Sequence, residues 1–90
     1  MTDMQSEITR LSGWTHANKK IRKEFRFETF RDAFAFMTRC AFEIEKMDHH
    51  PEWLNVYNKI TVELTTHDAG EVTMKDVKLA GIMDRVAARY

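Results

Sequence analysis

Apolar positions along this 90-residue chain change their spacing between two residues and three or four, and each change marks a predicted element. Helical spacing over residues 4–11 predicts a short first helix, which ends at Gly13. A first strand is expected over residues 14–16, followed by a turn over 17–19. Apolar and polar side chains then alternate over residues 21–28, which is typical of a strand with one face in water.

The spacing next becomes helical over residues 30–47. Thr29 followed by Asp32 resembles a capping pair and marks the start of this helix. Pro51 disfavours helical backbone angles in the residue before it, so the helix ends earlier. Its apolar stripe consists of Phe30, Ala33, Phe34, Met37, Ala41 and Ile44.

Alternation returns over residues 53–65 and predicts one long, central strand. The next residues, 67–70, read as a turn whose glycine takes a positive φ, and a short strand is expected at 71–72. Thr73 with Asp76 forms a second helix-start pattern, and an apolar stripe continues from there to the C-terminus. One face of the long strand is expected to carry Val56, Asn58, Ile60, Val62 and Leu64.

This order of elements favours the α+β class, with an antiparallel sheet of about four strands and helices packed on one face. Residues 1–90 are expected to form a single domain. A chain this short buries a small fraction of its surface, yet it carries six Phe, six Met, two Trp and two Tyr. Self-association is therefore expected.

Charge and cysteine content exclude several function classes. Basic and acidic residues balance at 14 each, which argues against direct nucleic-acid binding. The one basic run, residues 19–23, is interpreted as the solvated face of a strand. No apolar stretch reaches the roughly 20 residues of a membrane span. The single cysteine, Cys40, is expected to be a packing residue, and together these features predict a soluble, cytoplasmic protein.

Three of the four histidines, His49, His50 and His67, fall within 19 residues. Histidine can both donate and accept a proton near neutral pH. The first two follow a helix and the third follows the long strand, so they converge only if folding brings two loops together. His16 is isolated and is expected to be an exposed bystander.

Residue types and spacing leave three interpretations of this histidine cluster open. The residues could be ordinary loop histidines; they could join an acid as metal ligands; or they could transfer protons to an uncharged heteroaromatic ligand. Against the metal, neither an HExxH pair nor an HxH pair is present. For the ligand, Trp53 and Tyr57 lie near in sequence and offer flat surfaces for stacking.

A longer motif carries a family resemblance. It joins the Thr66-His67-Asp68-Ala69-Gly70 and Thr73-x-x-Asp76 segments to the run Glu45-x3-His49-His50-Pro51-x-Trp53-x-Asn55-Val56-Tyr57-Asn58-Lys59. With about a dozen positions at matching gaps, the chain resembles the pterin-4a-carbinolamine dehydratases from Gly13-Trp14 to Leu79-Ala80.

The resemblance implies a hydro-lyase that converts 4a-hydroxytetrahydropterin to quinonoid dihydropterin and water, in support of tetrahydrobiopterin recycling. It implies no metal and no organic cofactor, and assembly into homodimers or homotetramers. It places His49, His50 and His67 as the catalytic residues. The residues it implies for substrate binding or support are Glu45, Trp53 and Asp76.

Two further implications concern partners and loop shape. Some animal members of the family also act as dimerisation cofactors of a homeodomain transcription factor, which makes a coactivator the alternative function. Asp48 stands where many members carry Asn or another small polar residue, and Glu71 replaces a common glycine. The second departure predicts a different backbone angle at residue 71.

Overall fold

The computed structural model describes residues 4–90. Its helices and strands in chain order are α1 (Met4–Thr9), β1 (Thr15–Ala17), β2 (Lys20–Arg26), α2 (Phe30–Met47), β3 (Glu52–Val56), β4 (Lys59–Leu64) and α3 (Met74–Ala87), with a 3₁₀ turn at His67–Ala69 before α3. Within this described part, no helix is both long enough and apolar enough to cross a membrane.

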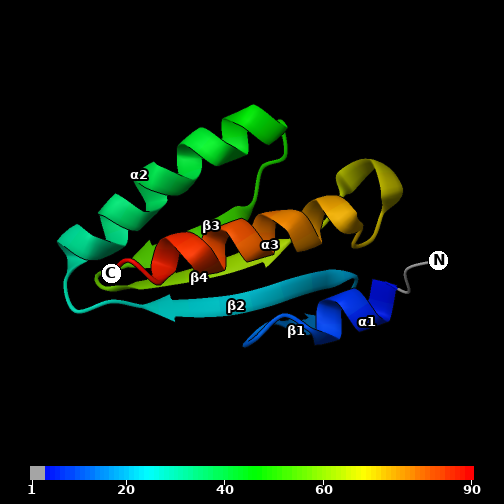
Figure 1. The fold of residues 1–90 in the computed structure, drawn as a ribbon, viewed down its shortest axis with the longest axis horizontal. Helices are drawn as coiled ribbons and strands as arrows, with labels where there is room; N and C mark the ends of the chain where they lie inside the picture. Colours follow the sequence, from blue (N-terminus) through cyan, green and yellow to red (C-terminus); the bar gives the residue numbers. More distant parts are fainter. Residues whose placement is uncertain (1–3) are drawn as a thin grey trace.

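The four strands form one antiparallel sheet in the order β1-β2-β4-β3, and the helices lie against one face of it (Figure 1). The sheet contributes Ile21, Phe25, Ile60, Val62 and Leu64 to the buried core. Fully burying an apolar side chain of this size contributes about 1.5–3 kcal/mol to stability. The predicted α+β class, with about four strands and helices on one face, is confirmed.

The two long helices begin where their polar caps predict. Thr29 Oγ1 accepts a hydrogen bond from the Asp32 amide at 3.0 Å, and α2 spans the predicted residues. Thr73 and Asp76 form a full capping box at the start of α3. Cys40 is completely buried on the inner face of α2, as a packing residue would be.

The predicted long strand over residues 53–65 is wrong, because it is two strands joined by a tight hairpin. Tyr57 takes a left-handed φ of 53°, and the Asn55 amide donates to the carbonyl oxygens of residues 57 and 59. Val56 pairs with Lys59 across the hairpin. Because of this turn, the residues of β3 lie on the faces opposite to those that one continuous strand would give them. Val56 is therefore 55% exposed, on the face of the sheet that the helices leave open. The assignments of Ile60, Val62 and Leu64 to the inner face hold.

The short strand expected at residues 71–72 is also wrong. Glu71 and Val72 form no strand; Glu71 makes only an isolated bridge with Thr66. Gly70 has the expected positive φ of 69°, whereas Glu71 is not among the positive-φ residues of the described chain. In the basic run, Lys20 and Arg22 pair with the carboxylates of Glu52 and Glu63 on the open face of the sheet.

Candidate active site

The three clustered histidines line one pocket of about 270 Å³, although they come from two separate loops. His49 and His50 follow α2, and His67 opens the 3₁₀ turn after β4. Thr66 and Lys75 also line this pocket, which we call the histidine pocket. The two loops therefore meet, as the catalytic interpretation of the sequence requires.

The loop after α2 leaves the helix through a left-handed residue. Asp48 caps the helix with φ 51° and ψ 45°, and its amide donates to the carbonyl oxygens of Ile44 and Glu45. Few residue types adopt this conformation readily; Gly, Asn and Asp are the common ones. The backbone of Asp48 thus sets the direction in which His49 and His50 follow.

His49 is fixed by a buried carboxylate. Its Nε2 lies 2.6 Å from Asp76 Oδ1, and the two side chains are 9% and 0% exposed. A carboxylate can only accept, so Nε2 carries the hydrogen of this bond. The other ring nitrogen, Nδ1, is then the one left for proton exchange in the pocket.

Asp76 is held in turn by two threonines. Its Oδ2 accepts from the Thr66 hydroxyl at 2.8 Å and from the Thr73 amide at 2.9 Å. The two threonine hydroxyls also bond to each other. The carboxylate therefore caps α3 and also orients His49. Its bonds to His49 and Thr66 are buried, and burial strengthens such bonds.

His50 and Glu45 form a second, exposed pair. His50 Nε2 lies 3.0 Å from Glu45 Oε2, and their side chains are 58% and 78% exposed. Exposed ion pairs contribute little to stability, so this contact mainly orients the imidazole. Glu45 therefore contacts one of the three histidines, and the supporting role that the family resemblance implies for it stays a prediction.

Not every residue expected near the histidines lies there. Trp53 is half-buried against the core and lines a different hollow, and Tyr57 is 65% exposed on the β3–β4 turn. Neither belongs to the lining of the histidine pocket, so the expected aromatic wall is not formed in this structure. His16 lies on β1, where its Nδ1 is 3.3 Å from Gln5 Oε1, so it is exposed but not isolated.

The sequence reasoning missed Thr66 and Lys75 as pocket residues. Thr66 directly precedes His67, and Lys75 directly precedes Asp76. Their places beside two proposed site residues were the only signal available. Thr73 was recognised as a helix cap, but its contact with Thr66 was not.

A metal centre gains no support from the side chains of residues 4–90. No group of three or more His, Cys, Asp or Glu residues there is arranged to hold an ion. One nitrogen of His49 and one of His50 already bind carboxylates.

Cys40 is expected to be unreactive in the folded protein. Burial, together with the nearby charge of Glu43, raises the pKa of its thiol from 9.0 to about 12. The thiolate is then about a thousandfold rarer below pH 9 than in the unfolded chain, and alkylation by iodoacetamide slows by about that factor. The folded state holds this proton more tightly, so the associated stability is complete below pH 9 and is lost between pH 9 and about 12.

Alkylation rates in native buffer and in guanidinium chloride measure the first effect. Urea unfolding of the wild type and Cys40→Ala at pH 8 and pH 10.5 measures the second. Equal alkylation rates in the folded and unfolded chain would contradict the burial argument.

The α+β fold brings two histidine loops to one pocket, and one of the imidazoles is bound to a buried carboxylate. This combination is typical of a domain that transfers protons. The family Pterin 4 alpha carbinolamine dehydratase matches residues 1–86. The chain belongs to this family, and the predicted resemblance is confirmed.

Individual relatives agree over nearly the whole chain. A protein of Solibacter usitatus, described as a pterin-4-alpha-carbinolamine dehydratase, is 49% identical over 87 residues, which are 97% of this chain and 92% of that protein. A similarly described protein of Sinorhizobium medicae is 54% identical over 83 residues, or 90% and 79% of the two chains. The crystal structure of a transcriptional coactivator/pterin dehydratase from Brucella melitensis superposes with a TM-score of 0.91 at 40% identity and covers 97% of both chains.

Proposed function

We propose that this protein is a hydro-lyase that removes water from 4a-hydroxytetrahydropterin to give the quinonoid dihydropterin. The observation that carries the proposal is the meeting of His49, His50 and His67 in one pocket, with His49 held by the buried Asp76. Relatives that share about half of its residues are described by this activity.

The reaction needs one proton delivered to the leaving hydroxyl and one removed from a ring nitrogen. His49 and His67 lie on the two loops that form the pocket, so each is placed to exchange a proton with a ring bound between them. We assign them the role of acid for the two configurations at C4a. His50, oriented by Glu45, holds the substrate. A positioned acid or base contributes roughly 10²–10⁴-fold to the rate.

The direct test is the decay of 4a-hydroxytetrahydropterin, generated by an aromatic amino-acid hydroxylase and followed by absorbance in a stopped-flow instrument. The rate is expected to rise in proportion to the concentration of this protein. A decay no faster than that in buffer would contradict the proposal.

We also propose that the chain self-associates in the cytoplasm. Phe30, Phe34 and Phe42 on α2 are 48%, 55% and 68% exposed. Leu54 and Val56 are exposed on β3, an edge strand of the sheet. Exposed apolar patches and open strand edges are typical of subunit interfaces. A transcription-factor partner, the alternative implied by the resemblance, stays a prediction.

Self-association through the exposed phenylalanines of α2 predicts that a charge placed among them lowers the mass of the assembly in solution. Phe42→Glu should shift the mass measured by analytical ultracentrifugation toward that of one chain, because a carboxylate cannot be buried unpaired. Met74→Glu is the matched control, since Met74 is also exposed but lies at the start of α3. A wild-type protein that sediments as a single chain would contradict self-association.

A further inference from the structure

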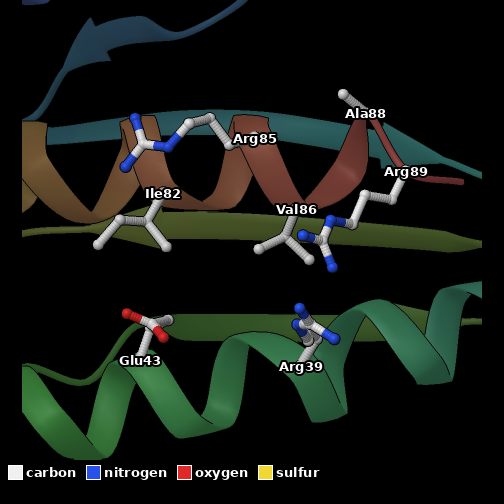
Figure 2. A pocket seen from close by; sticks show the side chains of 7 residues that line it. All are labelled: Arg39, Glu43, Ile82, Arg85, Val86, Ala88 and Arg89. Atoms are coloured by element: carbon white, nitrogen blue, oxygen red, sulfur yellow. The ribbon is translucent and has the colours of Figure 1, made fainter.

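A second hollow lies between α2 and the C-terminal half of α3, away from the histidine pocket. It has a volume of about 520 Å³ and shares no lining residue with that pocket. Ile82 and Val86 point toward α2 and give it an apolar wall (Figure 2), and Ala88 also belongs to its lining. We call it the arginine groove, because its other lining residues are Arg39, Glu43, Arg85 and Arg89.

Within residues 4–90, these three arginines have no carboxylate partner. Of the seven arginines in the chain, Arg10, Arg22 and Arg26 pair with Glu residues. Four arginines within residues 4–90 make no such pair, and three of those four line the groove. Glu43, the single acid in the lining, already lies 3.6 Å from Lys46.

Two of the guanidinium groups also face each other. Figure 2 shows Arg39 on α2 and Arg89 after α3 pointing toward each other across the groove. The lining carries a formal charge of +2 in a chain whose total formal charge is zero.

A purely structural role explains only part of this cluster. Cations near the C-terminus of a helix are favoured by the helix dipole, which accounts for Arg85 in the last turn of α3 and for Arg89 just after it. Arg39 lies in the middle of α2, where the dipole offers no such gain. Its guanidinium lies opposite that of Arg89, and the two positive charges repel each other unless an anion lies between them.

We propose that the arginine groove binds an organic phosphate of nucleotide size. A phosphoryl group carries about −1.5 to −2 charge at neutral pH, which matches the charge of the lining, and guanidinium groups bind it through paired hydrogen bonds. The organic part then covers Ile82 and Val86. A hollow of about 520 Å³ lies within the range of small-molecule sites.

The test is calorimetric titration of the full chain with adenosine 5′-monophosphate (AMP), at physiological salt. Arg39→Gln and Arg89→Gln should each weaken binding about tenfold or more, since each removes a charged hydrogen-bond donor. Arg31→Gln is the matched control, because Arg31 is an exposed arginine of α2 outside the groove and should bind like the wild type. Adenosine, which lacks the phosphate, should not bind.

Thermal melting without ligand supplies a second readout. At low salt, Arg39→Gln should melt no lower than the wild type, because repulsion with Arg89 is relieved. A lowered melting temperature with unchanged AMP affinity would show instead that the arginines are structural.

Other outcomes also overturn the assignment. If adenosine and AMP bind equally well, the groove does not recognise the phosphate. If inorganic phosphate and AMP bind equally well, it does not recognise the organic part. Arginine-dependent binding of a poly-glutamate peptide, without AMP binding, would assign the groove to an acidic protein segment.

Discussion

Replacing His50 and His67 together by alanine is expected to reduce the dehydration of 4a-hydroxytetrahydropterin to its spontaneous rate. The double variant loses one of the two proton-exchanging imidazoles and the imidazole that holds the substrate. Each positioned acid or base contributes roughly 10²–10⁴-fold, so the loss is measurable even though the uncatalysed reaction is fairly easy. Stopped-flow decay rates, with the buffer rate subtracted, measure it.

The fold of this variant should be preserved, which makes the result interpretable. Both side chains are exposed, and substitutions at such sites usually change the free energy of unfolding by less than about 0.5 kcal/mol. His16→Ala is the matched control, because it removes an exposed histidine that does not line the pocket. A double variant with the wild-type rate would refute the roles given to the two histidines.

Asp76→Asn is expected to lower both activity and stability. The amide has the same shape but is neutral, and one of its two ends is a donor. It cannot accept from His49 on one side and from Thr66 and the Thr73 amide on the other, as the carboxylate does. We expect kcat/KM to fall by about two orders of magnitude and the free energy of unfolding by about 2–4 kcal/mol.

Asp84→Asn separates these two effects. Asp84 also lies on α3 and binds the Lys23 ammonium at 2.7 Å and the Trp14 indole, but it is not part of the histidine pocket. This variant should lose some stability in urea unfolding and keep its kcat/KM. Unaltered kcat/KM in Asp76→Asn would show that His49 needs no buried carboxylate.

The sequence predicted the elements best where polar caps and apolar spacing agree. Thr29 and the apolar stripe of α2 fixed both ends of that helix, and Thr73 with Asp76 fixed the start of α3. The β3–β4 hairpin could not be seen in the same way. Its turn contains no glycine to mark it, because Tyr57 takes the left-handed angle instead. The alternation of apolar residues runs through the turn, although Leu54 and Val56 lie exposed on the face opposite Ile60, Val62 and Leu64.

The histidines could be named from sequence, but their meeting could not be derived from it. Position along the chain does not say that the loop after α2 reaches the turn after β4. The Thr66–Asp76–His49 connection depends on side-chain directions inside the fold. The arginine groove could not be predicted from the sequence for the same reason. Arg39 and Arg89 are 50 positions apart and meet only because α2 packs beside α3.

The left-handed backbone at Asp48 restricts how this position can change over evolutionary time. Asparagine, aspartate and glycine keep such an angle at small cost, whereas a β-branched residue there is a marked outlier. An exchange of Asn for Asp between relatives therefore conserves backbone geometry rather than charge. A valine at residue 48 would redirect the chain and carry both following imidazoles with it, so the backbone angle of this pocket-lining residue limits which sequences can keep this chemistry.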